Sequence, residues 1–288
     1  MNRPELITSV AGMQEASRKT RGRGTIGLVP TMGALHEGHL SLVRAAREIC
    51  DSVVVSIFVN PAQFGPHEDF ERYPRALQSD VDQLEREGVA SVFAPSVEEM
   101  YPDGESTFIE VSGVGDRLDG RSRPGHFRGV ATVVAKLFNI VMPDLAFFGQ
   151  KDAAQVAVLR AMVRDLNFPL KLMICPTVRE RDGLALSSRN RYLTDAQRAQ
   201  ARVLYRALLA AQTEAVGGAR DAAELRGVML HELEREPGVR IDYAEVVDPD
   251  TLLPVEDIGR GVLLAVAAWV GKTRLIDNLL LPEMRERS

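Results

Sequence analysis

The stretch TIGLVPTMGALHEGHLSLVRAAREICDSVVVSIFVN, residues 25–60, decides the fold class of this chain. It opens with a short β-rich run, TIGLVP, and closes with SVVVSIFVN, which is almost unbroken Val, Ile and Phe. A strand that is apolar on both faces is typical of a parallel sheet buried between helices. Between the two runs, Leu40, Val43, Ala46 and Cys50 recur at near-helical spacing. The stretch therefore predicts one β-α-β unit.

The same alternation of strand and helix patterns continues toward the middle of the chain. Helix patterns cover residues 75–87, 129–144 and 152–168, and strand patterns cover residues 89–95, 145–149 and 169–178. Repeated β-α units predict an α/β fold with a doubly wound, Rossmann-like parallel sheet. Ligands of such sheets bind beyond the carboxyl ends of the strands.

After about residue 178 the pattern changes. The segment RERDGLALSSRNRYL is polar and rich in turn formers. Two helix patterns follow, at 195–216 and 221–236, and then three strand patterns, at 239–248, 261–270 and 273–281. Helices followed by consecutive strands predict a smaller α+β domain. We expect residues 1–178 to form the Rossmann-like domain and residues 179–288 to form a C-terminal hinge and lid domain.

Composition excludes several classes of function. The 288 residues are 45% hydrophobic and 26% charged, which is typical of a soluble globular protein. A net charge of −5 without a long basic run argues against a nucleic-acid or anionic-membrane partner. No apolar stretch is long enough for a membrane helix. Two distant cysteines, together with an N-terminus that lacks the apolar core of a signal peptide, predict a cytoplasmic location.

The turn VPTMGALHEGHL, residues 29–40, is the first candidate for chemistry. It places His36 and His39 beside Gly33 and Gly38, where a strand is expected to turn into a helix. Free N–H groups and the positive end of a helix bind phosphate, and histidines add hydrogen bonds. The spacing of the histidines is not that of a zinc protease, and the glycines do not form G-x-G-x-x-G. A turn with incidental histidines is the remaining alternative.

A second turn, FFGQKDAAQ, repeats this arrangement at the end of another expected strand. Lys151 can hold a phosphate as a point charge, and Gln155 falls about one turn into the following helix, on the crevice side. The alternative is a solvated lysine, with Asp152 as the helix N-cap.

Two more stretches supply polar groups. LALSSRN offers Ser187, Ser188 and Arg189, which suit a triphosphate, although the segment alone resembles an ordinary loop. SIFVNPAQFG ends an expected strand with Asn60 and Gln63, neutral amides able to hold a small polar substrate, or else an Asn-Pro turn. For His126, in RPGHFRG, a structural role is favoured over contact with substrate.

The motifs together resemble one enzyme family. PTMGALHEGH, SIFVNPAQF, RPGHFRGV, FFGQKDAAQ, PTVRERDGLALSSRNRYL and TRLIDN occur in this order between residues 30 and 278. Their ensemble is similar to that of the pantothenate synthetases, or pantoate–β-alanine ligases. The resemblance implies a fold of the nucleotidyltransferase type and an ATP-dependent ligation. Pantoate and ATP would form pantoyl adenylate and pyrophosphate, and β-alanine would then release AMP and pantothenate. It also implies Mg²⁺, a homodimer and a cytoplasmic enzyme.

The resemblance also assigns residues, motif by motif. It implies catalytic roles for His36, His39, Lys151 and Arg189, with His39 as proton donor. It implies that pantoate and β-alanine are held by Gln63, Gln155 and Asn60, and that Asp80 is a partner for the metal. The residues that it assigns to ATP are Pro30, Thr31, Met32, Gly33, Ala34, Leu35, His36, Glu37, Gly38, His39, Gly149, Gln150, Lys151, Asp152, Val178, Leu186, Ser187, Ser188 and Arg189.

Two alternative functions stay open on sequence grounds. The His-x-Gly-His element also occurs in nucleotidyltransferases that act on other small metabolites. The neutral pair Gln63 and Gln155 argues against that alternative, because a phosphorylated acceptor would call for Arg or Lys. A nucleotide-binding module without turnover is the second alternative. The acidic net charge disfavours a tRNA synthetase.

Overall fold

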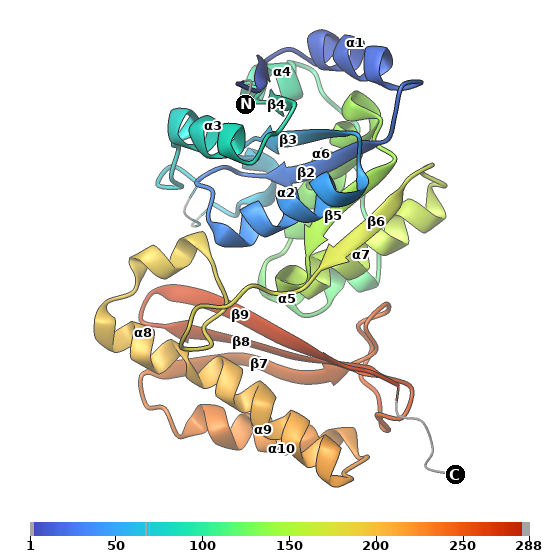
Figure 1. The fold of residues 1–288 in the computed structure, drawn as a ribbon. Coiled ribbons are helices and arrows are strands. Elements are labelled where there is room, and N and C mark those ends of the chain that lie inside the picture. The colour runs from blue at the N-terminus through green and yellow to red at the C-terminus, as the bar shows by residue number, and fades with distance from the viewer. Residues whose placement is uncertain (1–2, 67, 69, 284–288) are drawn as a thin grey trace.

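The computed structural model of the chain describes residues 3–66, 68 and 70–283. Its first part is built on a parallel sheet in the order β1-β4-β3-β2-β5-β6 (Figure 1). All five neighbouring pairs are parallel, which confirms the predicted doubly wound sheet. The strands are β1 (Glu5–Ile7), β2 (Ile26–Thr31), β3 (Ser52–Ile57), β4 (Ser91–Phe93), β5 (Leu145–Gly149) and β6 (Lys171–Cys175).

Helices cover both faces of this sheet because its central strands are apolar on both sides. In β3, Val53 and Val55 belong to the core under α2 (Glu37–Ile49) and α3 (Leu77–Arg86). Val54, between them, belongs to the core on the opposite face. That second core is covered by α1 (Val10–Thr20), α6 (His126–Val141) and α7 (Ala153–Asp165).

The strand and helix at the start of the chain were not predicted. β1 is only three residues long, and it adds to the edge of the sheet beside β4 rather than beside a strand adjacent in sequence. A strand this short carries almost no periodicity. Helix α6 begins at His126, three residues before the predicted start, with Gly125 in the left-handed region as its N-cap. The short helices α4 (Val97–Met100) and α5 (Asp119–Ser122) lie in the segment between β4 and α6.

The second part is a three-stranded antiparallel sheet in the order β7-β8-β9. The strands β7 (Val239–Val247), β8 (Val262–Val270) and β9 (Thr273–Leu281) match the predicted runs closely. The helix predicted at 195–216 is two helices, α8 (Asp195–Ala201) and α9 (Val203–Gly217), and α10 (Ala222–Glu234) follows. The α+β prediction for this part is confirmed; the boundary at residue 178 stays a prediction.

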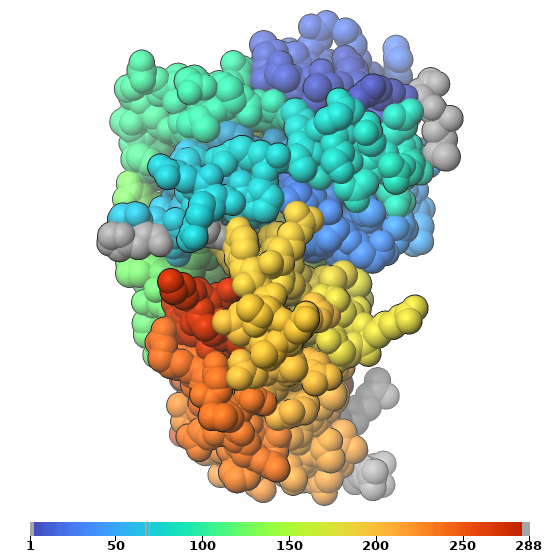
Figure 2. Space-filling model, turned by 90° about the vertical axis from the view of Figure 1, so that its left-hand side faces the viewer, coloured from blue at the N-terminus to red at the C-terminus, as the bar shows by residue number. Residues whose placement is uncertain are grey.

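The antiparallel sheet buries both of its faces. In β8, Leu264 and Val266 pack with α9 and α10. The intervening Ala265 and Ala267 belong instead to the core shared with the first part of the chain. In Figure 2 the golden segment with α8 lies across the junction, against the blue and cyan N-terminal part. The two sheets are therefore packed into one body, with the carboxyl ends of β2 and β5 near the junction. No helix within the described residues has the length and apolarity needed to cross a bilayer.

Candidate active site

A buried carboxylate holds the loop between β2 and α2 in place by accepting hydrogen bonds from its backbone. Asp80, on α3, is 1% exposed and accepts hydrogen bonds from the backbone N–H groups of Ala34 and Leu35, each at 2.9 Å. Gly33 adopts φ +81°, and a Cβ there would lie 3.0 Å from an Asp80 oxygen. A glycine at position 33 and a carboxylate at position 80 therefore fix the path of the loop.

His36 and His39 then cap the helix that this loop enters. The Nδ1 atom of His36, the N-cap of α2, accepts a hydrogen bond from the Gly38 N–H at 3.2 Å. The Nδ1 atom of His39 accepts one in return from the His36 N–H at 3.3 Å. The rings stack with centroids 4.0 Å apart. Because a backbone N–H occupies each Nδ1, the ring proton lies on each Nε2.

Both imidazoles are neutral at physiological pH. Burial, with the neighbouring His36 and Lys151 contributing, lowers the pKa of His39 to about 3. Burial is also the main cause of the lowered pKa of His36, again with Lys151 contributing. Each ring is therefore a hydrogen-bond donor through Nε2 and not a cation.

Three cations come from separate parts of the chain. Lys151 lies on the 3-10 turn Gln150–Asp152 that follows β5, and Arg189 lies on the 3-10 turn Ser188–Tyr192. The Ser187 hydroxyl caps the second turn by accepting from the Arg189 N–H at 3.2 Å. The third cation, Arg123, is held by Glu68 at 2.6 Å. These cations make the space between the two sheets favourable for an anion.

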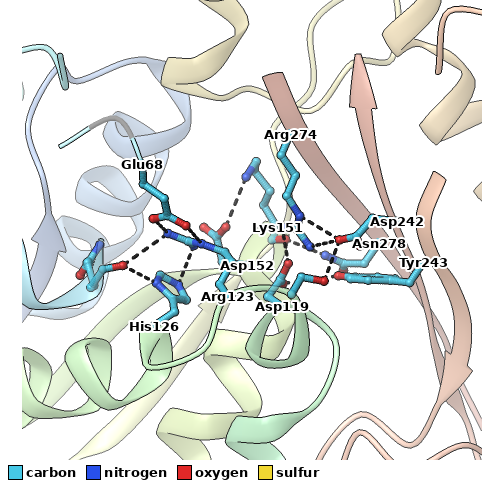
Figure 3. A network of polar contacts seen from close by, with 12 residues as sticks. Glu68, Asp119, Arg123, His126, Lys151, Asp152, Asp242, Tyr243, Arg274 and Asn278 are labelled. Atoms are coloured by element: carbon cyan, nitrogen blue, oxygen red, sulfur yellow. Dashed lines mark hydrogen bonds and ion pairs between the residues drawn. The ribbon is translucent and has the colours of Figure 1, made fainter. Parts of the chain in front are cut away.

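A carboxylate, that of Asp152, also lies close to Lys151. Asp152 follows Lys151 and lies 3.3 Å from its ammonium (Figure 3). Burial raises the pKa of Asp152, but the ammonium of Lys151 opposes it and holds the pKa below its usual value. Asp152 is therefore ionised and offsets part of the positive charge.

These groups line a cavity of about 200 Å³. It opens beyond the carboxyl ends of β2 and β5, where ligands of doubly wound sheets bind. His36, His39, Lys151 and Arg189 line this cavity, and so does Gln155 from α7. A smaller cavity of about 80 Å³ adjoins it and shares Arg123, Lys151 and Gln155 with it. Asp119 and Arg274 line the smaller cavity as well. The arrangement can bind a polyphosphate and a small polar molecule side by side.

Comparison with known proteins agrees with this geometry. The family model described as pantoate-beta-alanine ligase matches residues 5–280.

The chain belongs to the pantoate-beta-alanine ligase family.

A pantothenate synthetase of Koribacter versatilis is 60% identical over 277 residues, covering 96% of this chain and 95% of the relative. The crystal structure of pantothenate synthetase from Thermus thermophilus superimposes with a TM-score of 0.91 at 50% identity, covering 96% and 98% of the two chains. The pantoate-beta-alanine ligase of Francisella tularensis, solved in complex with β,γ-ATP and β-alanine, gives a TM-score of 0.78 at 35% identity and covers 96% and 97%. The resemblance inferred from the motifs is confirmed.

Most of the residues that the family resemblance assigned do line the larger cavity. From the nucleotide set these are Pro30, Met32, His36, Gly38, His39, Gly149, Lys151, Asp152, Val178, Leu186, Ser187, Ser188 and Arg189. Gln63 and Gln155, assigned to the organic substrates, line it as well. Segments separated by more than a hundred residues are thus brought together as expected.

Some assigned residues lie elsewhere. Thr31 is buried at the end of β2, and Gly33, Ala34 and Leu35 are buried within the loop itself. The exposed Glu37 pairs with Arg44. Gln150 turns its side chain toward Asn278 instead. None of these residues lines the larger cavity.

Asn60 and Asp80 have structural partners. Asn60 is 1% exposed and accepts from the Tyr101 hydroxyl at 2.7 Å. Its amide donates to the Gly129 carbonyl at 3.1 Å and to Gln63 Oε1 at 3.2 Å. Asp80 uses both oxygens on the loop and does not line the larger cavity. The geometry therefore supports positioning roles for both, Asn60 toward Gln63 and Asp80 toward the histidine loop.

Arg123 and His126 were not assigned from sequence, yet both line the cavity. His126 Nε2 lies 2.9 Å from the Arg123 guanidinium, which can only donate, so His126 carries its proton on Nδ1 and donates to the Gln63 carbonyl at 2.8 Å. Burial, with Arg123 contributing, lowers the pKa of His126 to about 4. The sequence motif that could have revealed these two residues is RPGHFRG, which begins at Arg123 and in which His126 opens α6.

Proposed function

We propose that the protein is an ATP-dependent ligase that joins pantoate to β-alanine through a pantoyl adenylate. One observation carries the proposal: two neutral imidazole donors, three cations and two carboxamides from five separate segments line one cavity. The membership of the chain in the pantoate-beta-alanine ligase family supports the choice of substrates.

Lys151 and Arg189 would stabilise the charge that develops on the phosphates. When a carboxylate attacks the α-phosphorus of ATP, negative charge builds up on the transferred group and on the departing pyrophosphate. Lys151 and Arg189 face this space from two different turns, and the side chain of Lys151 is only 21% exposed. Partial burial strengthens such electrostatic contacts because water screens them less.

His36 and His39 would donate hydrogen bonds from Nε2 to phosphate oxygens. The resemblance implied that His39 is a proton donor; in the protein without nucleotide, burial lowers the pKa of His39 to about 3 and keeps the ring neutral. A pre-aligned neutral donor stabilises the transition state without giving up its proton. The capping bonds to Nδ1 fix both rings for this purpose.

Gln63 and Gln155 would hold pantoate. Carboxamides bond hydroxyls and a carboxylate without adding charge, and a carboxylate needs no general base to act as a nucleophile. Gln63 is aligned by Asn60 and by the Met32 sulfur, which lies 2.9 Å from Gln63 Nε2. Gly129 lets α6 approach this turn closely, because a Cβ there would lie 2.1 Å from the Ala62 carbonyl oxygen.

The adjoining cavity would admit β-alanine in the second step. Its wall carries charges of both signs, among them Arg123 and the carboxylate of Asp119, which pairs with Arg274 at 2.6 Å. Charges of both signs suit a small zwitterion. The amine attacks the acyl carbon of the adenylate, the bond to the phosphate oxygen breaks, and AMP leaves. Packing of the second sheet over the site limits access of water, which would otherwise hydrolyse the adenylate.

Magnesium would enter as part of the MgATP substrate. Mg²⁺ keeps several waters and is commonly bound by phosphate oxygens with few protein ligands. Within residues 3–66, 68 and 70–283, no group of three or more His, Cys, Asp or Glu side chains is placed to hold a metal ion. On the family resemblance we also propose that the protein forms a homodimer and works in the cytoplasm. The free thiols of Cys50 and Cys175 agree with the reducing conditions of that compartment.

The proposal is tested by incubating the protein with MgATP, pantoate and β-alanine and analysing the products by mass spectrometry. We expect equal amounts of AMP and pantothenate, each dependent on all three substrates. Formation of ADP, or transfer of a nucleotide to the organic acceptor as the final product, would reject the ligase assignment.

A further inference from the structure

A buried asparagine of the second sheet grips the turn that carries Lys151. Asn278, on β9, is 5% exposed. Its Nδ2 donates to the carbonyl oxygens of Gln150 at 3.0 Å and Lys151 at 2.8 Å. Its Oδ1 accepts from Gln150 Nε2 at 3.1 Å. Every hydrogen of the Asn278 carboxamide is therefore used on the 3-10 turn Gln150–Asp152, and Asn278 lies beside Lys151 in Figure 3.

Asn278 is itself held rigidly by an ion pair. The neighbouring Asp277 accepts from the Asn278 backbone N–H at 2.8 Å and pairs with both ends of the Arg179 guanidinium, at 2.6 and 2.9 Å. Arg179 also donates to the Asn278 carbonyl at 3.3 Å and stacks over Tyr205 at 3.8 Å. A bidentate pair of this kind restricts geometry as well as adding energy.

The turn that Asn278 grips has little support of its own. Gly149, its N-cap, offers no side chain, and Asp152, the N-cap of α7, makes no capping hydrogen bond because its carboxylate faces Lys151. Carbonyl groups that are shielded from water need partners, and those of Gln150 and Lys151 are partly buried. Asn278 supplies them, from a strand 127 residues further along the chain.

We propose that Asn278 is a positioning residue that aligns Lys151 with the phosphates of the nucleotide. It acts through the backbone of the turn, so the alignment of Lys151 depends on docking of the second sheet. This inference rests on the proposed function, because Lys151 must act on a polyphosphate for its alignment to matter.

The test is a double-mutant cycle that measures pantoate-dependent exchange of labelled pyrophosphate into ATP. Misplacement of a catalytic group by about 1 Å can cost a hundredfold in rate, so Asn278→Ala is expected to slow exchange by roughly 10- to 100-fold. Added to Lys151→Ala, the same substitution should slow exchange by less than about threefold, because residues that act as a unit are strongly non-additive.

Two further variants separate positioning from stability. Asn278→Asp keeps the shape but turns an oxygen toward two carbonyl oxygens, and it should slow exchange at least as much as Asn278→Ala. Val246→Ala removes two buried methyl groups from the core under α9 and α10. It should lower the melting temperature while leaving the exchange rate within about twofold of the unsubstituted protein, since the loss is confined to packing.

Three results would overturn the positioning role. These are an unchanged exchange rate in both folded Asn278 variants, an equal factor of loss with and without Lys151, or a loss of the same size in Val246→Ala. Failure of the proposed function would look different, because the unsubstituted protein would then show no exchange that depends on pantoate.

Discussion

The His36 backbone N–H donates to Nδ1 of His39, and the two rings stack 4.0 Å apart at the first turn of α2. The hydrogen bond to Nδ1 fixes the orientation of the His39 ring, and with it the direction of the Nε2–H, relative to the first turn of α2. It also explains why the two histidines are three residues apart, because the third position of a helix is the one that can reach back to the N-cap.

Replacing His39 by Ala should slow formation of pantoyl adenylate more than it slows the reaction of the adenylate with β-alanine. Loss of one pre-aligned donor costs about 10²- to 10³-fold in comparable sites. Pyrophosphate exchange should therefore fall by roughly this factor, while transfer from separately prepared pantoyl adenylate to β-alanine should change far less. A single-turnover assay that finds the second half-reaction more affected would contradict the assigned role.

Lys151→Ala should lower turnover by roughly a hundredfold or more, the scale of losing one charge stabiliser. The ion pair with the neighbouring Asp152 is partly exposed, so its loss should change the free energy of unfolding by no more than about 1 kcal/mol. Steady-state rates and thermal unfolding measure the two effects separately. Normal turnover in a folded variant would remove Lys151 from the mechanism.

The pH dependence of stability should follow the buried histidines. The pKa values of His36, His39 and His126 are all lowered in the folded protein, the last two to about 3 and 4. Between these values and about 6.5 the unfolded chain binds more protons than the folded one, so unfolding becomes easier as pH falls. We expect the melting temperature to drop from pH 7 to pH 5, and to drop less in His126→Gln. An identical pH dependence in that variant would show that His126 does not contribute.

Asp80 should behave as a brace for the loop and not as a metal ligand. Asp80→Ala leaves two buried N–H groups without a partner, which costs about 1–3 kcal/mol each. The expected result is a lower melting temperature and weaker ATP binding, with the Mg²⁺ concentration for half-maximal rate unchanged in the residual activity. A large rise in that Mg²⁺ concentration with unchanged stability would restore the metal role that the family resemblance implied.

Gln155→Glu should weaken binding of pantoate by charge repulsion. The substitution preserves size but places a carboxylate beside a carboxylate substrate in a half-enclosed cavity. We expect the KM for pantoate to rise by at least tenfold, about 1.4 kcal/mol, while the KM for ATP changes little. Steady-state kinetics with each substrate varied in turn would reveal the opposite pattern if Gln155 contacts the nucleotide.

Much of the fold and site could be predicted because local pattern and strand order act together. Apolar strands such as β3 require cover on both faces, and a doubly wound sheet brings the ends of β2 and β5 to one edge. His39 and Lys151 each follow one of these strand ends, so their meeting was predictable. Arg189 lies far along the chain; its segment suited a triphosphate but alone resembled an ordinary loop, and the family resemblance assigned it to the ATP site.

What escaped prediction depends on contacts between distant segments. The family resemblance assigned Asp80 to the metal and Asn60 to the organic substrates, and nothing in the sequence revealed the tertiary hydrogen bonds to Leu35 and Gly129 that their side chains make. Arg123 needed the turn at Glu68 to be directed into the cavity. Pairings of this kind have no sequence period, so propensity and spacing do not reveal them.

The most direct test of the account is isotope exchange between labelled pyrophosphate and ATP in the presence of pantoate and Mg²⁺, without β-alanine. A site in which His39, Lys151 and Arg189 act together on the α-phosphate predicts exchange that needs pantoate and is lost with any one of the three. Exchange that proceeds without pantoate, or that survives removal of all three side chains in a folded protein, would contradict it.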